Sequence, residues 1–157
     1  MGRRSKIPTI EETIAFAAKA HEGQLDKMHQ PYILHPMRVM LMMLTFAERT
    51  VAILHDVVED TDATLQDLLD MGYPKVIIDA IDSVTKRKGE NYEDFIHRAS
   101  ENFIGRKIKK ADILDNLSPI RRYNFPAEKR NRLYSKYTKA LKILQDKELE
   151  LGVECFV

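Results

Sequence analysis

The segment from Thr50 to Thr61 carries four ionisable side chains inside an otherwise apolar stretch. They are His55, Asp56, Glu59 and Asp60. In a helix, at roughly 100° per residue, the four project from one side, and residues four apart in the sequence stack over each other. Ionised groups held away from water need an opposite charge or a metal ion. We therefore predict that this segment packs against a core and that a divalent cation compensates its charge.

Helical signals follow one another along the rest of the chain. Thr9 and Glu12 have the spacing of a capping box, and Pro74 suits the first turn of a helix. The expected helices cover about residues 10–23, 36–44, 46–58, 64–72, 74–85, 91–102, 104–117 and 127–150. No alternating strand pattern, repeat or second-domain linker is visible. The sequence predicts an all-α single domain of about seven or eight helices over residues 1–157.

The composition is that of a soluble globular protein, with 44% hydrophobic and 31% charged residues. Its longest apolar stretches, Met40–Leu44 and Val76–Ile78, are too short to span a bilayer. A single cysteine, Cys155, fits a reducing compartment. We expect a cytoplasmic protein with no membrane contact. The apolar residues 151–157 suit docking either on the core or on a second subunit, as in a homodimer.

The net charge of +1 hides an uneven distribution. Residues 1–85 hold 8 Lys and Arg against 13 Asp and Glu, whereas residues 86–142 hold 16 against 7. Such blocks are commonly solvated helix faces. They also suit an acidic metal-binding half that folds against a basic half which receives phosphates. A nucleic-acid partner is not expected, because acidic residues interrupt the basic ones and no single stripe forms.

Two further segments supply metal-ligand candidates. His35 precedes Pro36 at the expected start of a helix, and Asp112 shares a helix face with Asn116. Alone, His35 reads as a structural residue, but beside His55 and Asp56 it adds a ligand. Two imidazoles and two carboxylates suit Mn²⁺ or Fe²⁺ with an exchangeable water, whose pKa the ion would lower.

The order of these residues resembles the H…HD…D signature of the HD phosphohydrolase superfamily. The wider context is similar to the hydrolase domain of the RelA/SpoT alarmone family and to its small single-domain hydrolases. The matching stretches are 17–24, 31–36, 51–61, 83–86 and 110–116. The resemblance covers about residues 10–120, which form the motif-bearing core, and leaves the long C-terminal helix at about 127–150 outside it.

The resemblance implies a site and a reaction. Mn²⁺ would be held by His35, His55, Asp56 and Asp112. Glu59 and Asp60 match the family's catalytic acidic pair, and Asn116 matches its nucleotide-contacting asparagine. The family reaction removes pyrophosphate from the 3′ position of guanosine tetra- or pentaphosphate and leaves GDP or GTP. The expected partner is thus a nucleotide.

Other residues are candidates for binding that nucleotide. They are Lys27, Arg38, Lys86 and Arg87. One departure bears on the base: Asp26 stands where these hydrolases usually carry an arginine that packs on guanine. An aspartate cannot stack as a cation on a purine and would repel a nearby phosphate. Phosphatase activity on another nucleotide (ppApp, NADPH or a nucleoside monophosphate) therefore remains an alternative, as does a non-catalytic nucleotide sensor.

Overall fold

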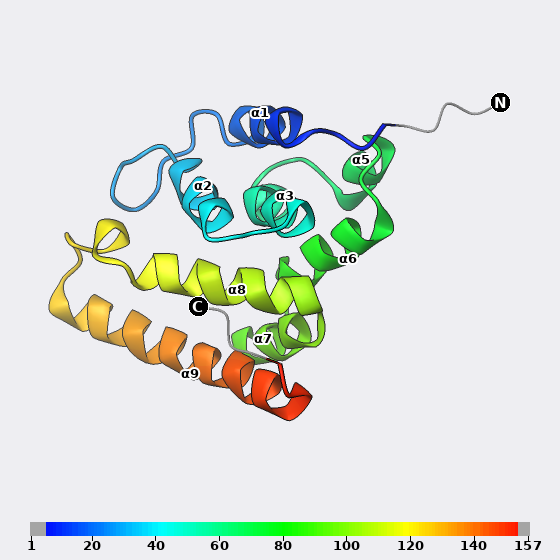
Figure 1. The fold of residues 1–157 in the computed structure, drawn as a ribbon. Coiled ribbons are helices and arrows are strands. Elements are labelled where there is room, and N and C mark those ends of the chain that lie inside the picture. The colour runs from blue at the N-terminus through cyan, green and yellow to red at the C-terminus, as the bar shows by residue number, and fades with distance from the viewer. Residues whose placement is uncertain (1–5, 154–157) are drawn as a thin grey trace.

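The computed structural model describes residues 6–153, and within them the chain is helical with no strand (Figure 1). The first five helices are α1 (Ile10–Ala20), α2 (Leu34–Leu41), α3 (Phe46–Leu54), α4 (Val57–Asp60) and α5 (Leu65–Asp70). They are followed by α6 (Lys75–Val84), α7 (Tyr92–Glu101), α8 (Phe103–Leu117), the 3-10 helix η1 (Pro119–Arg121) and α9 (Ala127–Leu151). The all-α prediction is confirmed.

The helix expected over residues 46–58 is divided in two. It ends at Leu54, and the single turn α4 begins at Val57. Asp56, between them, has φ −103° and ψ −5°, away from ideal helix geometry. At this point the Ala52 carbonyl accepts a hydrogen bond from the His55 ring. The division therefore falls at the two residues that carry the motif.

Local side-chain hydrogen bonds explain where several helices begin. Thr9, Thr45 and Thr64 each accept from the backbone N–H three residues on, and each is matched by an acidic side chain at that position. Asn91 and Asn102 cap α7 and α8 in the same way, without the reciprocal bond. Such caps satisfy backbone donors that a helix leaves free at its start.

Helix α8 lies between two apolar clusters. On one side, buried residues of α2, α3 and α6 pack with Ile108 and Ala111 of α8. On the other, Ile113 of α8 packs against buried residues of α7 and α9. Figure 1 shows these two helices next to α8. Gly105 permits the close crossing with α6, because a Cβ there would overlap the Ser83 hydroxyl. Since α8 packs on both sides, its polar residues are held rigidly where α2 and α3 meet it.

None of the helices within residues 6–153 combines the length and apolar character needed to cross a bilayer. Cys155, and most of the apolar ending that was considered for docking, fall outside the described residues.

Candidate functional site

Two imidazoles and two carboxylates meet where α2, the α3–α4 junction and α8 come together. His35 Nε2 lies 3.1 Å from Asp112 Oδ1 and 3.5 Å from Asp56 Oδ2. His55 Nε2 lies 3.0 Å from Asp56 Oδ2 and 3.8 Å from Asp112 Oδ1. All four side chains are buried. The predicted ligand set is thus brought together from three separate parts of the chain.

Both imidazoles are oriented by hydrogen bonds from their outer nitrogens. His55 Nδ1 donates to the Ala52 carbonyl at 2.7 Å, and His35 Nδ1 donates to Asp115 Oδ2 at 2.6 Å. In the neutral ring, each Nε2 then carries a lone pair that faces the two carboxylates. His55 Nε2 is buried and has no hydrogen-bond partner among residues 6–153. An orphaned imidazole nitrogen beside two buried carboxylates fits a divalent cation.

The pKa shifts of His55 and Asp56 favour positive charge within the cluster. Burial would lower the pKa of His55, but the negative charges of Asp56 and Asp112 raise it well above its usual range. Burial would likewise raise the pKa of Asp56, yet His55 lowers it. Protons and a divalent cation would therefore compete for the same atoms, as is usual for His and carboxylate ligands.

The cluster opens into a polar cavity of about 430 Å³. The predicted site residues on its wall are Lys27, His35, Asp56, Glu59, Asp60, Asp112 and Asn116. Its other lining residues are Leu25, Asp26, Tyr32, Tyr92, Lys109, Arg121, Phe125, Leu133 and Tyr137. The acidic centre is thus flanked by cations and by aromatic rings.

Glu59 and Asp60 have surroundings that suit proton transfer. Burial, followed by the charge of Asp56, raises the pKa of Asp60. The pKa of Glu59 is also raised, mainly by burial, although the hydrogen bond from the Lys86 backbone N–H to Glu59 Oε1 (2.7 Å) opposes the shift. A carboxylate whose pKa moves toward neutrality is better matched to accepting a proton near pH 7.

Three predicted substrate-binding side chains do not line the cavity. Arg38 donates from Nε and Nη2 to the two oxygens of Asp115, at 2.7 and 3.0 Å, and so braces the carboxylate that orients His35. The contact of Lys86 with the site is made by its backbone N–H, which donates to Glu59 Oε1. The Arg87 guanidinium pairs with Asp82 at 3.1 Å.

Sequence reasoning missed Lys109, although it lies three residues before Asp112 on one helix face. Its ammonium sits 2.7 Å from Asp112 Oδ2 at the cavity wall. Burial would lower its pKa, but the charge of Asp112 raises it. Tyr32 also lines the cavity, and it donates its hydroxyl to Asp56 Oδ2 at 2.7 Å.

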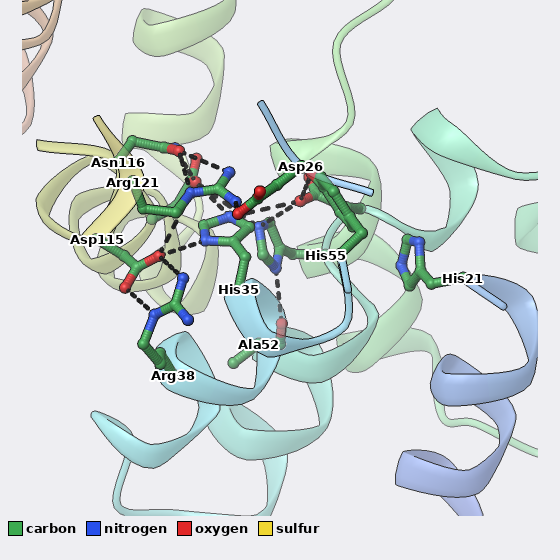
Figure 2. A network of polar contacts seen from close by, with 12 residues as sticks. His21, Asp26, His35, Arg38, Ala52, His55, Asp115, Asn116 and Arg121 are labelled. Atoms are coloured by element: carbon green, nitrogen blue, oxygen red, sulfur yellow. Dashed lines mark hydrogen bonds and ion pairs between the residues drawn. The ribbon is translucent and has the colours of Figure 1, made fainter. Parts of the chain in front are cut away.

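Asp26 is paired rather than isolated. Its Oδ1 accepts the backbone N–H groups of Met28 and Gln30, and its Oδ2 lies 2.9 Å from Arg121 Nη1. Figure 2 shows the Arg121 guanidinium between Asp26 and Asn116. The repulsion of phosphate expected from Asp26 is therefore offset by an arginine from η1, which the sequence offered no means of locating.

The chain resembles known proteins in sequence and in structure. No family model matches the sequence. The chain is 33% identical over 114 residues to the bifunctional (p)ppGpp synthase/hydrolase SpoT of Escherichia coli K12, covering 70% of this chain and 16% of that protein. It is 30% identical over 136 residues to a guanosine-3′,5′-bis(diphosphate) 3′-pyrophosphohydrolase of Aquifex aeolicus, covering 79% of this chain and 19% of that one. The chain thus spans less than a fifth of these relatives.

A solved structure is similar over almost the whole chain. It is that of a metazoan ortholog of SpoT that hydrolyzes ppGpp, with a TM-score of 0.72, 23% identity and 98% of both chains covered. This similarity shows the shared all-helical fold. With the sequence matches and the assembled cluster, the chain belongs to the HD-domain hydrolases of the RelA/SpoT type.

Proposed function

We propose that this chain hydrolyses the 3′-pyrophosphate of ppGpp and pppGpp, giving GDP or GTP and pyrophosphate. One observation carries the proposal: His55 clusters with His35, Asp56 and Asp112, and these three line a cavity together with Glu59 and Asp60. The activities named for the relatives support it. A pure binding module would have no need for this acidic pair beside a ligand set.

The proposed cofactor is Mn²⁺, held by the two Nε2 atoms and by oxygens of Asp56 and Asp112. When bound, such an ion polarises phosphoryl oxygens and lowers the pKa of a coordinated water. Other first-row divalent ions suit the same donors. The orientation of both rings by Ala52 and Asp115 supports the assignment of Nε2 as the ligand atom.

The chain's own groups then have separable roles. Glu59 is assigned as the proton acceptor for the attacking water, with Asp60 orienting it. The water oxygen bonds to the phosphorus attached to the ribose 3′ oxygen. The bond between this phosphorus and the ribose 3′ oxygen breaks. The 3′ oxygen takes up a proton, and pyrophosphate leaves. The ammonium of Lys109 and that of Lys27 lie on the cavity wall, where they can offset the charge that develops on phosphate oxygens.

A second candidate keeps the site and changes the nucleotide. Asp26 favours it, because this residue stands where guanine-stacking arginine is expected and its carboxylate is committed to Arg121. Hydrolysis of ppApp, or release of orthophosphate from NADPH or a nucleoside monophosphate, would use the same metal and acidic residues.

The test is product release by metal-stripped protein that is re-supplied with Mn²⁺. The substrates are ppGpp, pppGpp, ppApp, NADPH and nucleoside monophosphates, and Glu59→Gln serves as the inactive control. Pyrophosphate from ppGpp alone supports the lead proposal, whereas orthophosphate from NADPH or a monophosphate moves the assignment to the second candidate. Bound Mn²⁺ without turnover of any compound would leave a nucleotide sensor as the better description.

A cytoplasmic location and a homodimer also remain proposals. Light scattering coupled to size exclusion would test the second, with a mass of twice 18.2 kDa expected for a dimer.

A further inference from the structure

Arg121 occupies a central position in the cavity wall although it lies outside every recognised motif. It ends η1, just after α8, and its guanidinium is largely buried, with 12% of the side chain exposed. Figure 2 shows it beside Asp26, Asn116 and Asp115, between the loop that precedes α2 and the end of α8. A guanidinium offers five donors in a fixed plane, so it can bridge several acceptors at once.

Two polar contacts of this guanidinium lead to proposed metal ligands. Its Nη2 donates to Asn116 Oδ1 at 3.1 Å, and Asn116 Nδ2 donates to Asp112 Oδ1 at 2.7 Å. Its Nε lies 3.8 Å from the Asp115 oxygen that accepts from His35.

A third route runs through an aromatic ring. The guanidinium carbon of Arg121 lies 5.8 Å from the centroid of the Tyr32 ring, within the range of a cation–π contact. The hydroxyl of that ring donates to Asp56. Arg121 is therefore one side chain removed from three of the four ligands.

The remaining polar contact joins Arg121 to Asp26, in the loop that precedes α2. Asp26 Oδ2 receives Nη1 at 2.9 Å, while Asp26 Oδ1 is held by the two backbone N–H groups of its own loop. The backbone at Leu25 and Pro31 closes this loop with an isolated bridge. Asp26 thus fixes the guanidinium at one end, and the ligand partners fix it at the other.

We propose that Arg121 is a positioning residue whose ion pair with Asp26 sets the metal affinity of the site. This inference rests on the proposed function, since it takes the His and Asp cluster as the metal centre. Asn116 belongs to the same arrangement. Its amide oxygen accepts from Arg121 and its amide nitrogen donates to Asp112, so it transmits the position of Arg121 to that ligand. Partners of metal ligands commonly change metal affinity by about 10–100-fold when removed.

The experiment measures Mn²⁺ affinity by calorimetry on the nucleotide-free 157-residue protein. Arg121→Gln is expected to weaken Mn²⁺ binding by about 10–100-fold. Arg121→Lys keeps the charge but loses the planar set of guanidinium donors, so its Mn²⁺ affinity should lie between that of Arg121→Gln and that of wild type. Arg122→Gln is the matched control, because the neighbouring guanidinium donates to the Leu117 carbonyl instead. Circular dichroism confirms that each variant is helical.

Two further readouts separate positioning from a general structural effect. Asp26→Asn should weaken Mn²⁺ binding in the same direction, and adding it to Arg121→Gln should cost less than the sum of the two changes. Turnover of the Arg121→Gln variant should also recover when Mn²⁺ is raised above its weakened dissociation constant. Because circular dichroism establishes that the variant is folded before Mn²⁺ is added, this recovery reports metal binding rather than metal-assisted folding.

The results separate the role of Arg121 from the existence of the metal centre. Wild-type affinity in folded Arg121→Gln or Arg121→Lys protein overturns the role of Arg121 and leaves the metal centre in place. Equal weakening in Arg122→Gln also overturns it, since the effect would then belong to the loop. A wild-type protein that binds no divalent cation would overturn both.

Discussion

His35 and Asp115 are 80 residues apart in the sequence, and His35 Nδ1 lies 2.6 Å from Asp115 Oδ2. Asp115 is itself braced by both donors of Arg38, at 2.7 and 3.0 Å. A carboxylate in this position fixes the ring and strengthens the opposite nitrogen as a ligand. Asp115, one helical turn after Asp112 on α8, thus completes the site to which His35 belongs.

Asp115→Asn should weaken Mn²⁺ binding by about 10–100-fold, because the amide can accept from His35 but carries no charge to polarise the ring. The measurement is calorimetric titration of the metal-stripped variant. Asp79→Asn, in an exposed pair with Lys75, is the control and should bind as wild type does. Unchanged affinity in Asp115→Asn would show that the ring needs no anionic partner.

Glu59→Gln should lower kcat by about 10²–10⁴-fold while Mn²⁺ affinity stays at the wild-type value. The amide oxygen can still accept the Lys86 N–H, so the loop keeps its contact, but no proton acceptor remains. Steady-state kinetics and metal titration on the same preparation provide the check. A joint loss of metal binding would identify Glu59 as a ligand, contrary to its assignment as a base.

Mn²⁺ should raise the melting temperature of the wild-type protein and leave Asp56→Ala unaffected. An ion that binds only the folded state at 100 times its dissociation constant adds about 2.7 kcal/mol of stability. For a chain of this size, that corresponds to roughly 5–10 °C. Differential scanning calorimetry with and without a chelator measures it. A shift of equal size in Asp56→Ala would place the ion elsewhere.

Lys110→Met should destabilise the protein by about 3–5 kcal/mol, because it leaves the Glu148 carboxylate buried without its cation. The pair joins α8 to α9 with Nζ 2.8 Å from Oε2, and the two side chains are 2% and 7% exposed.

Urea unfolding gives the free-energy difference for this pair, and Lys142→Met in the exposed pair with Asp146 is the matched control. A loss as small as that of the control, about 0.5 kcal/mol or less, would mean that the α8–α9 pair is effectively hydrated. The combined variant Lys110→Met with Glu148→Leu should recover much of the lost stability, since no buried charge then remains.

The Glu90–Arg98 pair should make stability fall in acid. Arg98 donates to both oxygens of Glu90, and these hydrogen bonds lower the pKa of Glu90 from 4.5 to about 2. A carboxylate whose folded-state pKa is depressed stabilises the protein above about pH 4.5, and this contribution is lost as the pH falls toward 2.

Glu90→Gln should therefore be less stable than wild type by about 1 kcal/mol at pH 7, with the difference vanishing as the pH approaches 2. Urea unfolding of both proteins across this range measures the difference, in which the protonation of other carboxylates cancels. A difference that is independent of pH would mean that the pair contributes nothing through ionisation.

Much of the helical framework was predictable because its signals are local. The capping box of Thr9 with Glu12 and the N-cap at Asn91 act within a few residues, so the sequence alone locates those starts. The same holds for the clustering of His55 with Asp56 and of Asp112 with Asn116, whose spacing is short. The resemblance to the hydrolase family then named the set that these residues form with His35.

Contacts between distant segments depended on the tertiary structure. The break at His55 and Asp56, the bracing of Asp115 by Arg38 and the pairing of Asp26 with Arg121 were not predicted. Arg38 could reach either a phosphate or a carboxylate, and the packing of α2 on α8 placed Asp115 within reach. Sequence patterns report which face of a helix is apolar and where it starts. They cannot report which charges from remote segments meet, because packing decides that choice.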